Sequence, residues 1–531
     1  MTVRAFAFAA LMATAAIPAF AETPENQLVV GFSMTNLLTL DPAGITGRET
    51  VQVLANVYDN LVTHDPVDRT KVNPDLAESW EIAEDQKSIT FRLNGEATFA
   101  SGNPVTAADV VWSLNRLMQM NLAQSAFLKT YGFTAENAEA SFVAADDYTV
   151  VINLPKPVDP RIVVQTLGIV GPGSILDSAL VKENEVDGDW GAAWLNTNSA
   201  GSGMFTFEGW KANDRVILTR NDDFWGEPSA MRRIIMRHIP ESQNQRLMLE
   251  KGDLDIGYSL SAPDLKALSE EEGVAVISQP GSGFYYLAVS MKDERFANPK
   301  VREALRYLID YQGVNDAIMP FYGSFHQNPI QTGFTGERED PGYALDPEKA
   351  KALLAEAGYP EGFKTTLRAL ADAPFMSAAT AIQATLAQGG IEAEIISGSG
   401  EQIYGAMRER SFELLVGRGG GGQLPHPDSN LRAMIYNPDN SDEAKFSNFQ
   451  GWRTSFYDEE LNKEIDAAQV EADPGKQVEM YHAILDRIET VVPSIQPFSE
   501  VLDSVGYRAD LQNFVLNPSW GTDLGAITKA R

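Results

Sequence analysis

Apolar positions along the chain follow two different periods. Helical spacing is found at residues 49–61 and at 106–118, where a threonine with an aspartate three residues later forms a capping box at the start. Apolar runs or strict alternation at residues 28–32 and 88–93 predict strands. The N-terminal half therefore mixes strands and helices.

The second half alternates more regularly. The stretch QPGSG at 279–283 interrupts the pattern, and an apolar strand follows at 284–289. Asn298-Pro299 and Asp346-Pro347 each predict the start of a helix with proline in its first turn. Strands and helices then alternate at 365–371, 376–388, 392–396, 401–410 and 412–416. This order predicts a mixed α/β unit.

The N-terminus has the pattern of a secretory signal peptide. Arg4 precedes an alanine-rich apolar run that ends in Ala19-Phe20-Ala21, and a polar stretch follows. No later segment has 18 consecutive apolar residues, as a membrane-spanning helix would need. We expect cleavage after Ala21 and an exported, periplasmic protein without a membrane anchor.

Composition narrows the functional classes. A chain of 531 residues is too long for one core and predicts two or three domains. The net charge of −31 opposes binding to nucleic acid or to anionic lipid. The absence of cysteine excludes disulfides, thiolate metal sites and cysteine nucleophiles.

The stretch FELLVGRGGGGQLPHP at 412–427 contains a match to the dinucleotide motif G-x-G-x-x-G. A dinucleotide loop must lead into a helix, and we expect Pro425 and Pro427 to prevent one. We therefore exclude a nucleotide site. Two interpretations remain: a loop whose backbone amides hold a carboxylate or carbonyl, or a mobile surface loop.

No pattern typical of catalysis is present. The chain lacks H-E-x-x-H and G-x-S-x-G, and its five histidines are scattered without ligand spacing. We interpret His426 as a hydrogen-bonding surface group rather than a metal ligand. We interpret acidic pairs such as Asp253/Asp255 and Glu459/Glu460 as solvated surface. The sequence predicts no enzyme, no cofactor and no metal.

Several segments, in order, resemble one family along nearly the whole mature chain. They are VYDNLV at 57–62, NPDLAESW at 73–80, FASGNPVTAADVV at 99–111, RNDDFWG at 220–226, NPKVREALRYLID at 298–310 and DPEKAKALLAEAGYP at 346–360. The chain resembles the extracytoplasmic solute-binding proteins of ABC importers, in the class of dipeptide-, oligopeptide- and nickel-binding proteins.

This resemblance implies an α/β, two-lobed periplasmic-binding-protein fold (type II, Venus flytrap) with an extra subdomain on the first lobe. We expect lobe I at 22–65, 200–280 and 499–531, the subdomain at 66–199, and lobe II at 281–498. The ligand is enclosed by hinge closure, and the closed form, as a monomer, delivers it to the transmembrane subunits of an ABC permease.

The resemblance also indicates where the ligand binds. In the family, the loop after the strand at 412–416 usually reads W-x-x-D-Y-x-D-P, and in peptide binders its aspartate pairs with the α-ammonium. Here Gly420 stands at the tryptophan and Gln423 at the aspartate. A neutral amide cannot replace a carboxylate beside a buried ammonium, so ordinary free-amine peptides are in doubt.

Arg418 precedes this loop. We expect it to hold an anionic or carbonyl-rich ligand end; the alternative is that it only pairs with Glu409 or Asp428. The backbone amides expected to assist it are those of Gly419, Gly420 and Gly421.

Other cleft candidates are aromatic or follow the first strand of lobe I. They are Tyr285, Tyr286, Tyr404, Trp520, Asn36 and Leu37. Each aromatic side chain could equally lie in a core. We expect a peptide or peptide-like ligand; the alternatives are an opine or amino-acid conjugate, a sugar or a metal chelate. An exported hydrolase and a sensor partner or folding helper are the other functional classes.

Overall fold

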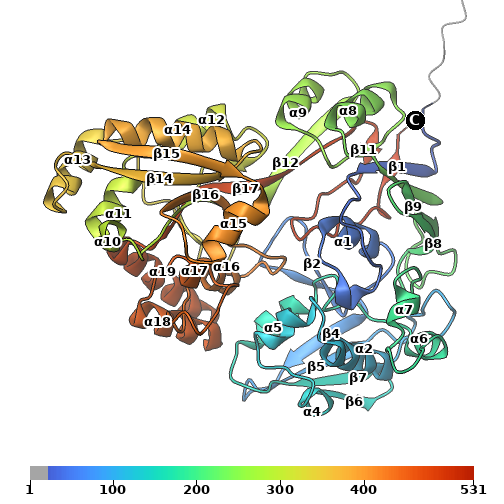
Figure 1. Ribbon diagram of the computed structural model, residues 1–531. Helices are drawn as coiled ribbons and strands as arrows, with labels where there is room; N and C mark the ends of the chain where they lie inside the picture. The colour runs from blue at the N-terminus through green and yellow to red at the C-terminus, as the bar shows by residue number, and fades with distance from the viewer. Residues whose placement is uncertain (1–21, 531) are drawn as a thin grey trace, which may run out of the picture.

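The protein has two lobes that share one large mixed sheet (Figure 1). A computed structural model describes residues 22–530. The sheet has 11 strands, with the main order β15-β14-β16-β12-β17-β11-β1-β10-β9-β8 and β13 paired to β17. The strands β12 (Val274–Val289) and β17 (Ile495–Arg508) pair along most of their length and run from one lobe into the other. The predicted α/β two-lobed fold is confirmed.

The first lobe is built around β1, which corresponds to the strand predicted at 28–32. It pairs in parallel with both β10 and β11. The predicted helix at 49–61 ends early, at Leu54, and the chain then turns so that the Val57 carbonyl accepts a hydrogen bond from Gly203 N. The main elements are β1 (Gln27–Phe32), β8 (Phe205–Lys211), β9 (Arg215–Arg220), β10 (Arg233–His238), β11 (Ile256–Gly257), α1 (Arg48–Leu54), α8 (Ser242–Lys251) and α9 (Ala262–Ser269).

Further short elements lie outside the 11-stranded sheet. They are η1 (Pro42–Gly44), β2 (Val62–His64), β3 (Val72–Pro74), α6 (Ser178–Glu183), α7 (Ala192–Leu195), β18 (Leu511–Gln512) and β19 (Thr528–Lys529).

A separate four-stranded antiparallel sheet, in the order β4-β5-β7-β6, forms the subdomain with α2. The predicted capping box is present: Thr106 and Asp109 exchange hydrogen bonds at the start of α2. The elements are β4 (Ala77–Ile82), β5 (Ser88–Leu93), β6 (Phe142–Asp146), β7 (Thr149–Asn153), α2 (Ala107–Met120), α3 (Ser125–Lys129), α4 (Ala138–Ser141) and α5 (Pro160–Thr166).

The second lobe contains the alternating series that the sequence predicted. Parallel pairing joins β14 to both β15 and β16, and the helices α14 and α15 connect these strands. The series is β14 (Phe363–Leu370), α14 (Phe375–Gln388), β15 (Ile391–Gly398), α15 (Gly400–Arg408) and β16 (Leu414–Gly419).

The helices around this series begin where proline predicted them, at Pro299 and Pro347. The remaining elements are α10 (Glu294–Ala297), α11 (Pro299–Arg306), α12 (Tyr311–Ala317), β13 (Gly323–Ser324), α13 (Pro347–Glu356), α16 (Pro427–Met434), α17 (Gln450–Arg453), α18 (Glu459–Val470) and α19 (Pro474–Val491).

The QPGSG stretch does not end a strand. Pro280 pairs with Leu502 and Phe284 pairs with Glu500, so three residues of β12 lie opposite one residue of β17. The result is a bulge inside a continuous strand pair, at the point where the pair passes between the lobes.

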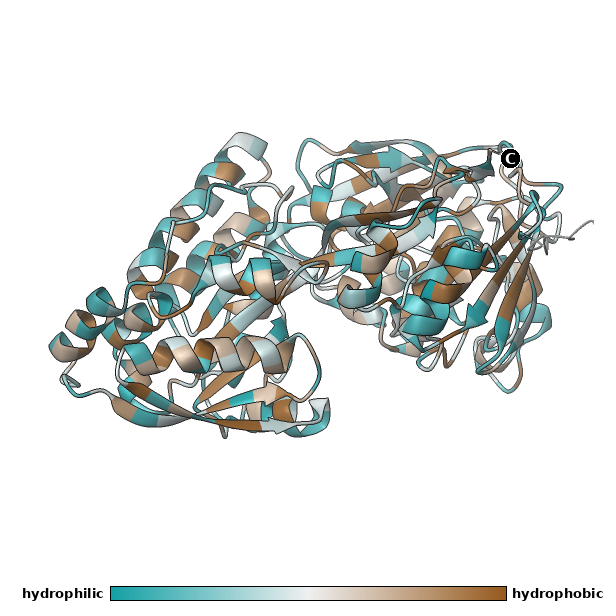
Figure 2. Cartoon of the chain, turned by 90° about the horizontal axis from the view of Figure 1, so that it is seen from above, coloured by the Kyte–Doolittle hydropathy of each residue, from teal (hydrophilic) through white to brown (hydrophobic). Residues whose placement is uncertain are grey.

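Apolar side chains form separate cores in the two lobes and the subdomain. Figure 2 shows both brown and teal residues on most helices, as expected when one face of a helix packs inward. In lobe II the sheet lies between two cores: Tyr285 belongs to one, and its neighbour Tyr286 to the other. The domain boundaries given above stay a prediction.

The proposed signal peptide and the cleavage point after Ala21 lie outside the described residues. Among the helices at residues 22–530, none has the length and apolar character needed to cross a bilayer.

Candidate functional site

The glycine loop, residues 419–423, begins at the last residue of β16, at the boundary between the lobes. β16 runs antiparallel to β12, and this places Arg418 opposite Tyr285. Gly420 has a φ of 82°, which favours glycine. A Cβ on Gly421 would lie 2.3 Å from the backbone nitrogen of Gly283. The loop therefore needs glycine to pass so close to the β12 bulge.

Three polar side chains fix this loop. The side chain of Asn430 donates to the Gly420 carbonyl at 2.6 Å, and Ser282 Oγ donates to the Gly422 carbonyl at 2.6 Å. Gln331 accepts from the backbone of Gly283 and donates to the carboxylate of Glu500, at 3.1 and 2.9 Å. These bonds join the loop to both crossing strands.

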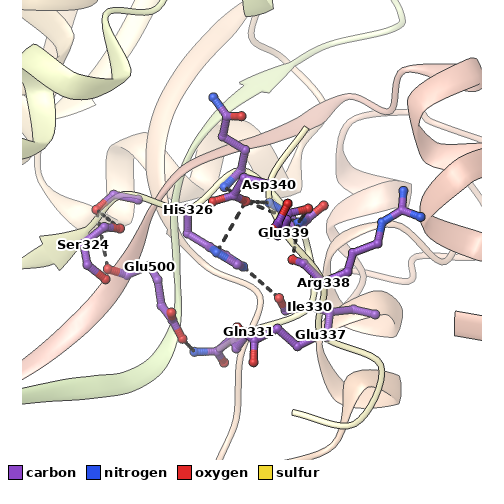
Figure 3. A network of polar contacts seen from close by, with 12 residues as sticks. Ser324, His326, Ile330, Gln331, Glu337, Arg338, Glu339, Asp340 and Glu500 are labelled. Atoms are coloured by element: carbon purple, nitrogen blue, oxygen red, sulfur yellow. Dashed lines mark hydrogen bonds and ion pairs between the residues drawn. The ribbon is translucent and has the colours of Figure 1, made fainter. Parts of the chain in front are cut away.

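Figure 3 shows the segment that positions Gln331. His326 lies between the Asp340 carboxylate, 3.5 Å from Nδ1, and the Ile330 carbonyl, which accepts from Nε2 at 2.8 Å. Burial lowers the pKa of His326, but the hydrogen bond and charge of Asp340 raise it overall. Through these two contacts the ring holds in place the turn that carries Gln331.

The expectation that two prolines prevent a helix is wrong. Helix α16 begins at Pro427 with His426 as its N-cap, because proline lacks only an N–H that the first helical turn leaves unbonded. His426 is also not a surface group: it is 3% exposed, and burial lowers its pKa to about 3. Its neutral Nδ1 accepts a hydrogen bond from Asp428 N.

Arg418 presents an exposed guanidinium. Within residues 22–530 this group has no hydrogen bond or ion pair, and Asp428 pairs with Arg432 instead at 2.8 Å. The Arg418 guanidinium lies 5.9 Å from the centre of the Tyr285 ring. Its backbone N–H donates to the hydroxyl of Tyr404 at 3.0 Å. The alternative of an internal partner, Glu409 or Asp428, therefore finds no support.

The two adjacent tyrosines lie in different surroundings. Tyr285 contacts the ring of Phe375, and its hydroxyl is under the influence of both Arg418 and Asp503. Burial raises the pKa of Tyr285. Tyr286 is fully buried in the opposite core. Only Tyr285 is thus near charged groups of both lobes.

The first lobe contributes an ion pair that the sequence analysis missed. Arg48 Nη1 lies 2.9 Å from Asp503 Oδ1, and the guanidinium lies 5.9 Å from the centre of the Trp520 ring. Asp503 is 3% exposed, and its Oδ2 has no hydrogen-bond partner in the described part of the chain. The pair joins residues 455 positions apart, so no local pattern could have revealed it.

The glycine loop contacts the first lobe through Gln423, which bonds to the residue just before Trp520. Ser519 Oγ donates to the Gln423 carbonyl at 3.0 Å. The side-chain N–H groups of Gln423 and Trp520 are both buried, and neither has an acceptor among the described residues. Trp520 has a φ of 75°, a conformation that is costly for a residue with a bulky side chain.

Asn36 and Leu37, the two candidates after the first strand, differ in exposure. Asn36 is exposed and donates to Glu49 at 3.5 Å, whereas Leu37 is buried in the lobe I core. Among the described residues, no hydrogen bond or ring contact joins either of them to the glycine loop. Their place in the site stays a prediction.

Further contacts hold the lobes together away from this point. Leu424, just after the glycine loop, packs into the subdomain core. Arg69 donates to the carbonyls of Thr332 and Gly281, at 3.0 Å each. The backbone of Asp159 donates to the Gln469 carbonyl at 2.9 Å. These contacts add to those of the glycine loop.

Nothing in the described residues forms a metal site: no group of three or more His, Cys, Asp or Glu side chains is arranged to hold an ion. The polar groups gathered between the lobes are hydrogen-bond donors, acceptors and charges rather than a nucleophile with its base. This arrangement can bind a polar solute.

Comparisons with known proteins place the chain among solute-binding proteins. The family model described as "Bacterial extracellular solute-binding proteins, family 5 Middle" matches residues 71–442. The probable D,D-dipeptide-binding periplasmic protein of Escherichia coli K12 is 28% identical over 525 residues, covering 96% of this chain and 95% of the relative. The dipeptide-binding protein of the same organism is 26% identical, covering 87% of each chain.

The solved structure of HbpA2 from Haemophilus parasuis matches with a TM-score of 0.81 and 25% identity, covering 95% of this chain and 100% of that one. Both Escherichia coli relatives are named as dipeptide-binding proteins, and one of them is named as periplasmic. The family match spans more than half of the chain, and this protein belongs to the bacterial extracellular solute-binding proteins of family 5.

Proposed function

We propose that this protein is the periplasmic binding component of an ABC importer and that it captures a peptide or peptide-like solute between its lobes. The observation that carries the proposal is the set of buried polar groups without partners at the lobe boundary. Gln423 and Trp520 offer N–H donors there, and Asp503 offers a carboxylate oxygen. Each such group costs about 1–3 kcal/mol if it stays unpaired.

A peptide-like solute supplies what these groups need. Its carbonyl oxygens accept from Gln423 and Trp520, and its ammonium pairs with Asp503 Oδ2. Asp503 thereby takes the role of the carboxylate that the family resemblance implies at the position of Gln423. At the other end, Arg418 and the amides of the glycine loop hold a carboxylate; hydrogen bonds to charged groups contribute about 1.5–3 kcal/mol each.

Closure of the lobes couples binding to delivery. Gln423 comes from lobe II, whereas Trp520 and Asp503 lie on the first-lobe side of the boundary. A ligand that contacts both sides binds the closed arrangement better than the open one and shifts the population toward it. The closed form, as a monomer, then docks on the permease.

Native mass spectrometry of protein purified from periplasm tests the ligand class. An added mass that fragments into amino-acid residues supports the peptide assignment. An added mass without an amide ladder contradicts it and favours an opine or another conjugate; one structural neighbour was solved with agropinic acid, at 24% identity and a TM-score of 0.72. Recovery of the ligand unchanged after incubation supports binding without catalysis. The intact mass also tests cleavage after Ala21.

Titration of that ligand then tests the role of Arg418. We expect Arg418→Ala to weaken binding at least about tenfold, because one charged hydrogen bond is lost. Arg408→Ala is the matched control: this arginine is also exposed, on the neighbouring helix α15, and no ion pair is found for it in the described residues. Equal affinity of Arg418→Ala and wild type would show that Arg418 holds no ligand end.

A further inference from the structure

A cavity lies within the first lobe, behind the segment that contacts Gln423. Its volume is about 360 Å³. It is lined by the turn after α1, by β2 and by the C-terminal segment around residues 513–526. Three carboxylates, Asp59, Asp75 and Asp523, line it, and of its described lining residues none is lysine or arginine.

The hydrogen bonds of these carboxylates leave their charge uncompensated. Trp225 Nε1 donates to Asp59 at 3.0 Å, the Asn60 backbone donates to Asp75 at 2.9 Å, and the Gly525 backbone donates to Asp523 at 2.7 Å. All three donors are neutral. No salt bridge to any of these aspartates occurs within residues 22–530.

This arrangement raises the pKa values of the carboxyl groups. Burial raises the pKa of Asp59 to about 6, and the charge of Asp523 adds to the effect. Burial and then the charge of Asp59 raise the pKa of Asp75 well above its usual range. A bound cation would offset the free-energy cost of burying the charged carboxylates and would reduce the repulsion between them.

Asn60 provides an independent indication of a ligand. Its side chain lines the cavity and is only 5% exposed. The amide nitrogen donates to the Gly168 carbonyl, but Oδ1 has no donor among the described residues. A buried amide oxygen in this state needs a hydrogen-bond donor, which an ionised carboxylate cannot supply.

We propose that this cavity is a second binding site, for a small organic polycation of the diamine or polyamine class. The acidic groups are not arranged around one point as metal ligands would be. Ammonium groups spaced along an aliphatic chain can instead reach separate carboxylates and the Asn60 oxygen. The cavity volume suits a small organic molecule.

This site adjoins the interlobe contact. His64 and Ser519 both line the cavity, and His64 Nδ1 lies 3.3 Å from the Ser519 hydroxyl that donates to Gln423. Burial lowers the pKa of His64 to about 4, so the ring is neutral and does not repel a cation. An occupant would therefore hold in place the segment to which the glycine loop binds.

Calorimetric titration of the mature protein with spermidine and putrescine tests the proposal. We expect saturable binding of both, and at least about tenfold weaker binding in Asp75→Asn and in Asp523→Asn, since each loses one charged contact. Asp222→Asn, which changes an exposed carboxylate paired with Arg220, is the matched control and keeps wild-type affinity. Methylammonium, with one charge, binds more weakly than either probe.

A second variant separates binding from folding defects. Thr63→Lys places an ammonium at the cavity wall while all three carboxylates remain. We expect it to abolish spermidine binding and to raise the Tm of the ligand-free protein. The proposal is overturned if spermidine shows no saturable binding or if the aspartate variants bind it normally. It is also overturned if Asp503→Asn alone removes binding, because the polycation would then occupy the interlobe site.

Discussion

The interlobe site and the lobe I cavity both contain buried polar atoms without partners, but they differ in kind. The interlobe site offers N–H donors from Gln423 and Trp520 together with an acceptor on Asp503. The cavity offers the Asn60 oxygen, which has no donor among the described residues, together with three aspartates, and none of its described lining residues is lysine or arginine. Donors together with a carboxylate fit a zwitterionic solute, whereas three carboxylates without a basic residue beside them fit a polycation. The partner that is missing thus defines the ligand class at each site.

The largest expected effect that separates the two sites comes from Asp503→Asn. We expect the interlobe ligand to bind about a hundredfold more weakly, because a buried ammonium loses its counter-charge and Arg48 loses its partner. Calorimetry with the native ligand measures this loss, and spermidine binding should stay unchanged. Asp486→Asn, on an exposed carboxylate, is the control. Unaltered ligand affinity would remove Asp503 from the site.

The next largest effect is on the free energy of unfolding, and it is expected from Asp59→Asn in the cavity. Because the folded pKa of Asp59 is about 6, the folded state binds more protons than the unfolded state between about pH 4 and pH 6. The contribution of Asp59 to stability is therefore present at low pH and is lost as pH rises through 6. Relative to wild type, Asp59→Asn should gain about 2–3 kcal/mol between pH 4 and pH 7.

Chemical denaturation at several pH values measures this difference. A constant gap between Asp59→Asn and wild type across the range would contradict it. The variant and wild type must be compared at the same pH, because His64 and His426 also titrate over this range. Their pKa values are lowered in the folded state, so their contribution to stability rises as pH rises.

A smaller effect is expected from Gln423→Ala. Loss of one neutral hydrogen bond to a ligand carbonyl should weaken binding by about tenfold at most. Gln423→Glu sharpens the test: it removes the N–H donor and adds a carboxylate, so ligands with a free ammonium should bind better than carbonyl-rich ones. If both variants match wild type in affinity, the Gln423 side chain does not contact the ligand.

The smallest effect is expected from Trp520→Phe. This change keeps an aromatic ring beside Arg48 and removes only the indole N–H, so a loss of about threefold to tenfold in affinity is expected. The affinity for spermidine serves as the internal control, since the Trp520 side chain is absent from the cavity lining described here. An equal loss of both ligands would indicate a local folding defect instead.

Local signals predicted much of the fold. The proline starts of α11 and α13, the capping box of α2 and the alternating series of lobe II all depend on neighbouring residues, and all are confirmed. Helix α16 was missed because proline was treated as a breaker at a position where it starts a helix.

The candidate site was predictable only in part. Arg418, Tyr285, Tyr404, Gln423 and Trp520 lie around the lobe boundary, although their contacts with a ligand stay a prediction. The Arg48–Asp503 pair depends on chain segments that only tertiary folding brings together.

The bulge between Pro280 and Phe284 has a mechanical consequence. Two long antiparallel strands form an elastic ribbon between the lobes, and its stiffness is lowest where three residues lie opposite one and the ladder is interrupted. Opening and closing would therefore concentrate bending at these few bonds. Lengthening or shortening the bulge would change the rates of ligand capture and release together, even if every residue that contacts the ligand were left intact.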